Sequence, residues 1–368
     1  MQVVFRTDAS TQIGNGHLMR CLTLAETLRS GAVECQFICR EHSGNLIEQI
    51  QLRGFVVHVL PVGTKYISTN ELADSARIDH SAWLGTDWSE DAAQTKTIIG
   101  NTVADWLIID HYALDARWES ALRPFCLKLM VIDDLANRLH DCDLLLDQNL
   151  GRKVADYDQL LPQGCNVLAG PHYALLKSEF AALRDYSLQR RAKSKVEHLL
   201  ISMGGVDQSN ATGRILRALL DCLLPLDMRI TVVMGPHAPW LDSVQALSKQ
   251  MPQPTEVLVN VSNMAQLMAD CDLAIGAAGG TAWERCCLGL PTLTLVLAEN
   301  QRDGAAALAQ CGSVKLVDCV SDVPQALRAI LDLSDSGFVL SQMSQNSCLI
   351  TDGNGVGRVR DAVCECYC

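Results

Sequence analysis

Residues 11–20, Thr-Gln-Ile-Gly-Asn-Gly-His-Leu-Met-Arg, place a histidine directly after two closely spaced glycines. An apolar run precedes this segment and an amphipathic run follows it, which predicts a strand, a glycine loop and a helix. Gly14 and Gly16 carry no Cβ, so the backbone can turn tightly and a ligand can come close. We expect His17 in the first helical turn, where the helix dipole disfavours imidazolium and keeps the ring available as a general base. The alternative interpretation is that His17 only caps the helix.

A second glycine-rich segment, residues 276–284, reads Gly-Ala-Ala-Gly-Gly-Thr-Ala-Trp-Glu and follows another predicted strand. Small residues such as Gly279 and Gly280 allow the backbone to approach a diphosphate, and Thr281 could add a hydroxyl group. Glu284 lies about one turn into the following helix, where a carboxylate can accept two hydrogen bonds from a ribose diol. The alternative is an acid that complements the helix dipole.

The segment 202–207, Ser-Met-Gly-Gly-Val-Asp, also leads from a predicted strand into a helix. Gly204, Gly205 and Val206 could bind an anion through free backbone N–H groups at the helix N-terminus. An ordinary strand-to-helix turn, capped by a serine or an asparagine, is the alternative.

Polar residues follow three further predicted strands. They are Asp110, His111 and Tyr112, then Asp133 and Asp134, then Asn300 and Gln301. The first group could bind sugar hydroxyls or support the histidine of the first loop. The paired acids could bind a metal, act as acid and base, or simply cap and solvate a turn. The amides suit acetamido and hydroxyl groups, and a plain helix cap is the alternative for them.

Strand-like and helix-like runs alternate along both halves of the chain. Strands are predicted at residues 3–5, 35–39, 56–59, 107–109, 129–132, 198–202, 230–234, 256–259, 273–275 and 293–297. This pattern is typical of parallel sheets covered by helices on both faces. Residues 65–88 are polar and irregular and could form a loop near the site, and residues 150–165 are interpreted as part of a passage between domains. We therefore predict an α/β protein with two doubly wound, Rossmann-like units facing a cleft.

The composition argues against several classes of function. The chain has 368 residues, 48% of them hydrophobic and 20% charged, which fits a globular protein of two domains. A net charge of −12 argues against binding to nucleic acid or to an anionic membrane. No apolar run reaches the roughly 20 residues of a membrane-spanning helix. The N-terminus enters a strand without a signal peptide, so we expect a cytoplasmic protein.

The 16 cysteines are interpreted as free, mostly buried thiols. Zinc spacing would need two Cys-x-x-Cys-like pairs or added histidines, and neither appears. We therefore expect no metal site and no cofactor. For the assembly we expect a monomer or a weak homo-oligomer.

Several of these segments together resemble a known family. The pattern Asp8-x-Ser10-x-x-Ile13-Gly14-x-Gly16-His17-x-x-Arg20-Cys21-Leu22 is similar to the N-terminal signature of the UDP-sugar hydrolases of pseudaminic acid biosynthesis. Residues 110–115, 133–138, 147–149, 170–176 and 299–301 look like further family segments. The second half also resembles the wider GT-B glycosyltransferases, including the peptidoglycan transferase that uses UDP-N-acetylglucosamine.

The resemblance implies a GT-B fold. An N-terminal catalytic and sugar-binding domain would span residues 1–165, a C-terminal UDP-binding domain would span 166–352, and a last helix, 353–368, would pack back on the first domain. The backbone of Val261 would contact uracil, Glu284 the ribose, and Gly204, Gly205 and Gly280 the diphosphate. Asp8, Ser10, Gly14, Gly16 and Arg20 would lie at the sugar.

The implied reaction is hydrolysis of UDP-2,4-diacetamido-2,4,6-trideoxy-β-L-altropyranose at the anomeric C–O bond, which releases the free sugar and UDP. His17 would take a proton from water, the configuration would invert, and helix N-termini would stabilise the leaving UDP without a metal. A glycosyltransferase that uses a UDP-amino sugar donor is the alternative. A regulator that binds a UDP-sugar without catalysis is a second alternative, and a related UDP-diacetamido hexose is another candidate substrate.

Overall fold

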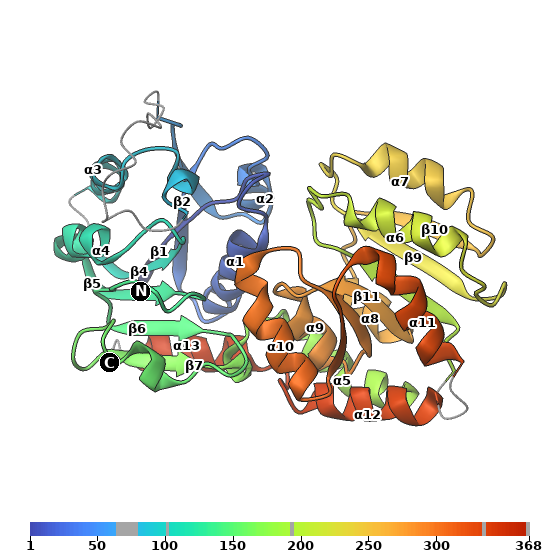
Figure 1. The fold of residues 1–368 in the computed structure, drawn as a ribbon. Coiled ribbons are helices and arrows are strands. Elements are labelled where there is room, and N and C mark those ends of the chain that lie inside the picture. The colour runs from blue at the N-terminus through green and yellow to red at the C-terminus, as the bar shows by residue number, and fades with distance from the viewer. Residues whose placement is uncertain (64–79, 101–102, 192–194, 333–335, 366–368) are drawn as a thin grey trace. The chain divides into compact units, whose positions relative to one another are not determined.

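The computed structural model describes residues 1–63, 80–100, 103–191, 195–332 and 336–365. The chain divides into two compact units (Figure 1). The first comprises Met1–Leu175 together with Val356–Cys368, and the second comprises Leu176–Gly355. Each unit contains one parallel sheet with helices on both faces, which confirms the predicted α/β, doubly wound class.

The first unit is built on seven parallel strands in the order β3-β2-β1-β4-β5-β6-β7. The strands are β1 (Gln2–Thr7), β2 (Glu34–Arg40), β3 (Val56–Leu60), β4 (Ala104–Asp110), β5 (Cys126–Ile132), β6 (Leu144–Asp147) and β7 (Asn166–Ala169). The interior strand β1 has Phe5 opposite Phe37 of β2 and Ile108 of β4. All three side chains are buried, as expected for a sheet that is covered on both faces.

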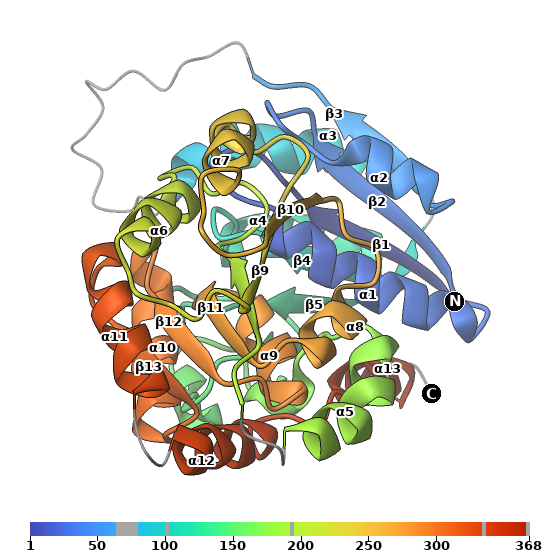
Figure 2. The same ribbon diagram turned by 90° about the vertical axis from the view of Figure 1, so that its right-hand side faces the viewer.

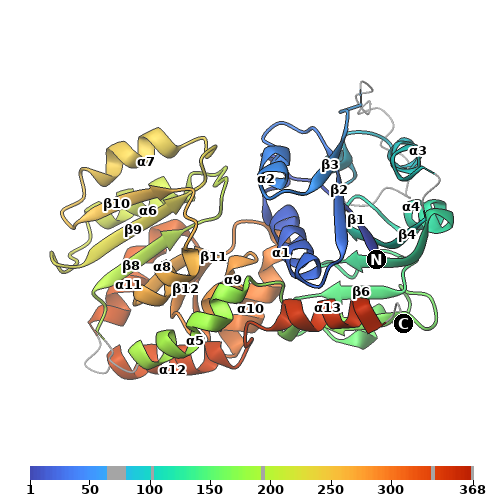
Figure 3. The same cartoon turned by 180° about the vertical axis from the view of Figure 1, so that it is seen from behind.

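Alternate side chains of this sheet enter two separate cores. The helices of the unit are α1 (Gly16–Ser30), α2 (Ile47–Leu52), α3 (Trp88–Ile99), α4 (Ala116–Leu122) and α13 (Gly355–Glu365), with short 3-10 turns η2 (Ser81–Leu84), η3 (Arg123–Phe125), η4 (Val154–Tyr157) and η5 (Pro171–Tyr173). Val3 and Phe5 face the core formed with α1, α2 and α13, whereas Val4 faces the core formed with α3 and α4. Figure 3 shows α13 lying along β6 on its side of the sheet.

The second unit has six parallel strands in the order β10-β9-β8-β11-β12-β13. They are β8 (His198–Ser202), β9 (Arg229–Met234), β10 (Thr255–Val259), β11 (Leu273–Ala277), β12 (Thr292–Leu295) and β13 (Val314–Val317). In both sheets the strand order reverses beside the first strand of the unit. The reversal lies between β1 and β4 in the first sheet and between β8 and β11 in the second. Ligands of open α/β sheets bind at the carboxyl ends of the strands next to such a reversal.

Helices also cover both faces of the second sheet (Figure 2). They are α5 (Ser178–Arg190), α6 (Ala211–Leu220), α7 (Leu241–Ser248), α8 (Met264–Asp270), α9 (Thr281–Cys287), α10 (Arg302–Gln310), α11 (Val323–Leu331) and α12 (Ser336–Cys348), with η6 (Glu299–Gln301) and η7 (Val320–Asp322). Apolar residues of α6, α7 and α11 form one core with the sheet. None of the helices among the described residues is long and apolar enough to cross a membrane.

The division of the chain differs from the sequence prediction in two ways. Residues 150–165 are not a passage between domains, because they carry η4 and lead into β7, whose residues Asn166–Ala169 pair with β6. The first unit therefore continues to Leu175, past the expected boundary at 165. The cysteines of the described residues are free and most of them are buried, as predicted.

Candidate active site

The loop between β1 and α1 is held by its own polar groups. The Ser10 hydroxyl accepts hydrogen bonds from the backbone N–H groups of Gln12 (3.1 Å) and Ile13 (2.9 Å). The N–H of Gly14 donates to the Ser10 carbonyl (2.8 Å), and Gly14 has a φ of +82°, which favours glycine. This compact turn ends at Gly16, the first residue of α1, so His17 lies in the first helical turn.

A buried carboxylate orients His17. Nδ1 of His17 lies 2.6 Å from Oδ1 of Asp110, the last residue of β4. Thr7, at the end of β1, is in register with Asp110, so the two loops leave neighbouring strands at the same level. The carboxylate fixes the proton on Nδ1 and leaves the lone pair on Nε2, for which the described residues provide no hydrogen-bond partner.

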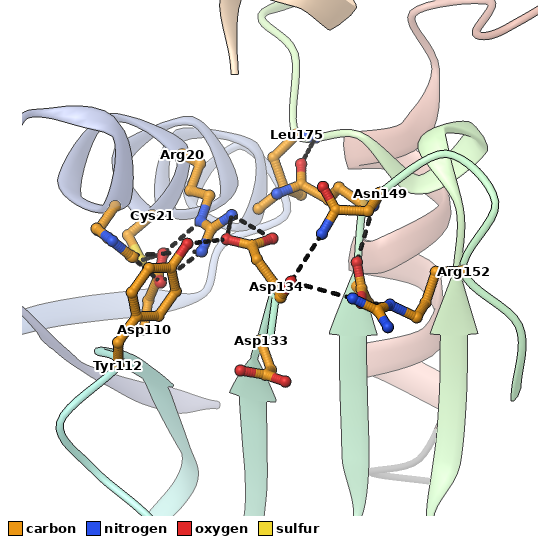
Figure 4. Close-up of polar contacts among 12 residues, drawn as sticks. Arg20, Cys21, Asp110, Tyr112, Asp133, Asp134, Asn149, Arg152 and Leu175 are labelled. Carbon is orange, nitrogen blue, oxygen red and sulfur yellow. Dashed lines mark hydrogen bonds and ion pairs between the residues drawn. The ribbon is translucent and has the colours of Figure 1, made fainter. Parts of the chain in front are cut away.

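Arg20, one turn further along α1, joins this carboxylate to a second one (Figure 4). Its Nε donates to Asp110 (2.6 Å), and its other nitrogens contact Asp110 (2.7 Å) and Asp134 (2.7 Å). Burial by itself would raise the pKa of Asp110, but the charges of Arg20 and His17 lower it well below its usual range. Asp110 therefore stays ionised beside the histidine.

Tyr112 completes the same network. Its hydroxyl donates to Asp134 (2.7 Å), and its ring meets the His17 ring edge-on with centroids 4.5 Å apart. Burial, followed by the negative charge of Asp134, raises the pKa of Tyr112, so the phenol remains protonated. Arg20 of α1 and Tyr112, which follows β4, therefore hold the carboxylates that lie near His17.

Three residues expected at the sugar are instead enclosed. Asp8 is fully buried and accepts hydrogen bonds from Arg6 (2.7 Å) and from the N–H of Arg40 (2.7 Å). His111 accepts from the N–H of Ala113 at Nδ1 (3.1 Å), and its Nε2 lies 3.3 Å from Asp8. Ser10 is buried as well, with its hydroxyl engaged in the loop. We therefore interpret these buried side chains as supports of the loop between β1 and α1.

The paired acids after β5 have separate roles. Asp133 is fully buried and binds Arg138 (2.7 Å), the N–H of Ala136 (2.8 Å) and the hydroxyl of Tyr157 (3.0 Å). Asp134 is directed toward Arg20 instead (Figure 4). Asp133 is thus a structural residue. No group of three or more potential metal ligands occurs in the part of the chain that the structure describes.

In the second unit, the loop between β8 and α6 closes on itself. The Asp207 carboxylate accepts from the N–H groups of Ala211 and Thr212, both at 2.8 Å, and Asn210 accepts from Gly213 (3.1 Å). The first-turn donors of α6 are therefore occupied by the protein's own side chains, contrary to the expectation of a free helix N-terminus. Gly204, Gly205 and Val206 precede this cap and are partly or fully exposed.

The loop between β11 and α9 holds a buried arginine that the sequence analysis overlooked. Arg285 donates to the hydroxyl of Thr281 (3.0 Å) and to the carbonyl of Ala277 (2.6 Å). Because Thr281 accepts this bond, its own hydroxyl hydrogen is left to donate to a ligand. A Cβ on Gly276 would lie 2.7 Å from the Arg285 guanidinium, so only glycine leaves room for that group. Gly280 caps α9 and is exposed.

Glu284 is half-buried, and the described residues give it no hydrogen-bond partner. Burial raises the pKa of Glu284 to about 7, although the charges of Arg285 and Lys177 oppose that shift. A carboxylate that is desolvated but unpaired gains most from a ligand that donates hydrogen bonds to it.

The remaining predicted residues also follow strands of the second sheet. Val261 lies between β10 and α8 and is half-buried. Gln301, in η6, accepts from the N–H of Leu297 (3.1 Å), and its amide nitrogen would lie 3.6 Å from a Cβ on Gly279. Asn300 is exposed beside it. The structure thus groups Gln301 with the glycine loop of the second unit.

Two further aromatic residues, which the sequence motifs did not include, lie close to Tyr112. Trp83 stacks on Tyr112 with ring centroids 5.7 Å apart, and His80 contacts both rings. They belong to the stretch 65–88 that was expected to form a loop near the site. Residues 65–79 of that stretch lie outside the described residues, whereas 80–88 do reach the neighbourhood of Tyr112.

Comparison with known proteins supports the resemblance. No protein-family model matches the chain. An uncharacterized protein of Methanocaldococcus jannaschii is 27% identical over 309 residues, which cover 82% of this chain but only 57% of that protein. The UDP-2,4-diacetamido-2,4,6-trideoxy-beta-L-altropyranose hydrolase of Campylobacter jejuni is 27% identical over 313 residues, which cover 85% of this chain and 97% of the hydrolase.

Solved structures agree on the fold. The crystal structure of Acinetobacter baumannii MurG superposes with a TM-score of 0.66 at 16% identity and covers 99% of both chains. The UDP-GlcNAc 2-epimerase of Neisseria meningitidis, bound to UDP-GlcNAc, gives a TM-score of 0.65 at 10% identity over 99% of this chain and 100% of that one. The two doubly wound units are therefore of the GT-B type, as the resemblance implied.

Proposed function

We propose that this protein is an enzyme that acts on a UDP-sugar, and that it hydrolyses the bond between the anomeric carbon and UDP. The observation that carries the proposal is the His17–Asp110 pair, in which a buried carboxylate holds Nδ1 and leaves Nε2 as the basic nitrogen. The similarity to the Campylobacter hydrolase over 85% of the chain supports the reaction and the 2,4-diacetamido-2,4,6-trideoxy sugar.

In the proposed mechanism, Nε2 of His17 takes a proton from water. The water oxygen forms a bond to the anomeric carbon while the bond to the UDP oxygen breaks, so the configuration at that carbon inverts. Asp110 stabilises the imidazolium that forms, as a carboxylate does for a catalytic histidine. Arg20 and Tyr112, which fix the neighbouring carboxylates, are the side chains of the first unit that we place nearest the sugar.

Nucleotide binding is assigned to the second unit. Glu284 has a raised pKa and no hydrogen-bond partner among the described residues, so we assign it to the ribose diol. We assign Gly204, Gly205, Gly279 and Gly280 to the diphosphate. The hydroxyl of Thr281 is available as a donor because Arg285 occupies its acceptor side. Val261 is proposed for uracil, and Gln301 joins the phosphate group of residues rather than the sugar group.

The proposal can be tested by determining which product receives the oxygen atom of water. Hydrolysis in water enriched in ¹⁸O should place the label on the anomeric carbon of the released sugar and leave UDP unlabelled. The first proton NMR spectra, recorded before mutarotation, should show the inverted anomer. Label in UDP would mean attack at phosphorus and would refute the assignment of His17.

A matched pair of variants distinguishes the role of His17 as a general base from the binding of UDP by the nucleotide loops. His17→Ala should lower kcat by about 10²–10⁴, as expected for loss of a general base, while the Kd for UDP stays within twofold. His58→Ala is the control because this histidine lies in the edge strand β3, two strands away from β1, and its ring binds Gln36. A His17→Ala protein with wild-type kcat would contradict the mechanism.

Transfer to a sugar or lipid acceptor is the competing function, because the second half of the chain also resembles the GT-B glycosyltransferases. The same ¹⁸O experiment distinguishes the two. With its acceptor present, a transferase would form UDP faster than it releases labelled free sugar. A hydrolase would form the two products at equal rates.

A further inference from the structure

We propose that Trp83 is a further sugar-contacting residue, whose indole ring forms an apolar wall for the methyl-bearing face of an N-acetylated, 6-deoxy hexose. The inference rests on the proposed function, since it takes the sugar to lie beside His17. It extends that function by naming a residue for sugar specificity that lies outside the glycine loops and their signature.

The first observation is the continuous row of aromatic rings that ends at the proposed base. The rings of His17 and Tyr112 meet edge-on at 4.5 Å, and the rings of Tyr112 and Trp83 are stacked at 5.7 Å with an interplanar angle of 24°. Trp83 is half-buried, so part of its indole surface remains open to solvent although it stands next to the site. A half-buried indole beside a ligand site is suited to an apolar contact with that ligand.

The second observation is that the short turn η2, which carries Trp83, is fixed to the carboxyl ends of β2 and β3. The N–H of Gly63, just after β3, donates to the carbonyl of Gly85 (3.1 Å). A Cβ on Gly85 would lie 2.8 Å from Cε1 of His42, which follows β2. The turn is therefore packed against the edge of the sheet where α/β proteins bind ligands.

The third observation is backbone strain at the start of that turn. His80 has a φ of +69°, in the left-handed region that residues other than glycine seldom adopt, and the carbonyl of His80 accepts from the N–H of Trp83 (2.8 Å). Strain of this kind persists where the surroundings impose it, and it is concentrated at functional sites. Here it accompanies a ring that lies outside the core clusters formed by the described residues of the first unit.

The chemistry of the wall indicates the class of sugar. An aromatic face attracts C–H groups and methyl groups more than hydroxyl groups, because hydroxyl groups lose water without gaining a hydrogen bond. Acetamido methyls and a C6 methyl provide such groups, whereas glucose provides mainly hydroxyls. Trp83 would therefore favour deoxy, N-acetylated sugars over fully hydroxylated ones.

The test compares Trp83→Ala and Trp83→Phe with the control Trp88→Ala. Trp88 is also half-buried, but it begins α3 and contacts Arg117 instead of the aromatic row. We expect Trp83→Ala to raise KM for the UDP-diacetamido sugar by about threefold to tenfold, with kcat reduced less and Kd for UDP unchanged, and Trp83→Phe to restore most of the loss. Trp88→Ala should leave all three constants at wild-type values.

Saturation-transfer NMR with the free diacetamido sugar provides a readout that does not depend on turnover. Its methyl signals should be enhanced with wild-type protein and weakened with Trp83→Ala. An unchanged KM together with an unchanged NMR enhancement would overturn the inference. A fall in kcat alone would also overturn it, because it would show that Trp83 acts only through Tyr112. If the wild type hydrolyses no UDP-sugar, the proposed function fails, and the NMR comparison still decides the role of Trp83.

Discussion

Replacing Asp110 with asparagine tests the catalytic pair most directly. The carboxylate lies 2.6 Å from His17 Nδ1 and receives two hydrogen bonds from Arg20, at 2.6 and 2.7 Å. An amide has one oxygen, so in either orientation one N–H of the amide faces an N–H of the guanidinium. If the amide nitrogen turns toward His17, it donates to Nδ1 and moves the imidazole proton to Nε2, which removes the base.

If the amide oxygen turns toward His17 instead, the tautomer is kept but the imidazolium loses its counter-charge. The first arrangement costs about 10⁴ in kcat and the second about 10², equivalent to roughly 5 and 3 kcal/mol of activation free energy. Loss of one charged hydrogen bond should lower the free energy of unfolding by about 1.5–3 kcal/mol. We therefore expect Asp110→Asn to fold with reduced stability and to lose at least 10² in kcat.

The assay is turnover of the UDP-diacetamido sugar by NMR, with UDP affinity from calorimetry and thermal unfolding as the check on folding. The Kd for UDP should remain within twofold, since the proposed nucleotide residues belong to the second unit. Asp115→Asn is the matched control, because Asp115 is a buried aspartate that caps α4 and pairs with Arg117. A folded Asp110→Asn protein whose kcat stays within threefold of the wild type would show that Asp110 does not support His17 in catalysis.

Three further predictions concern the second unit and the metal question. Since the pKa of Glu284 is raised to about 7, UDP affinity measured by calorimetry should increase as pH rises through 7. Folding stability should decline as pH rises from about 4.5 to 7, because the folded protein favours the protonated acid. Both trends should disappear in Glu284→Gln. Gly280→Ala should leave thermal unfolding unchanged, because no atom of the described residues lies within 4 Å of the new Cβ, yet it should weaken UDP binding at least tenfold. Its counterpart Gly235→Ala should lower stability, because the new Cβ would overlap the carbonyl oxygen of Gly205. Equal UDP affinity in Gly280→Ala and the wild type would remove that loop from the diphosphate. Turnover should survive EDTA, because Asp133 is bound to Arg138 and Asp134 to Arg20, whereas a rate that is lost and then restored by magnesium would contradict this.

The longer strands and the two parallel sheets were predictable because their residues form apolar runs. Three of the four-residue strands, β6, β7 and β13, were not predicted, because such short segments carry no periodicity and β7 contains only Asn-Val-Leu-Ala. The equally short strand β12 was predicted because it lies in the longer apolar run 293–297. The pairing of His17 with Asp110 was foreseeable in outline, because both follow predicted parallel strands. That neighbouring strands end in register was visible only in the structure.

Burial separates the candidate side chains in a way that the sequence did not indicate. Asp8 was expected at the sugar, but Arg6 and Asp91, which comes from a helix 85 residues away from Arg6, enclose it in a charged network. No local pattern specifies such a distant partner. Asp207 likewise reads as one more polar residue of a glycine loop, although its carboxylate occupies the first-turn donors of α6.

The discontinuity of the first unit has a consequence for how the protein is made. Val356, Val359 and Val363 complete the core that α1 and α2 form with the first sheet, yet they are translated after the entire second unit, residues 176–355. At 5–20 residues per second, the ribosome needs on the order of ten to forty seconds for that interval. During this time the nascent first unit exposes an unfinished apolar face, while the second unit can fold as one contiguous segment. A premature stop shortly before residue 356 would therefore damage the part of the protein that left the ribosome first.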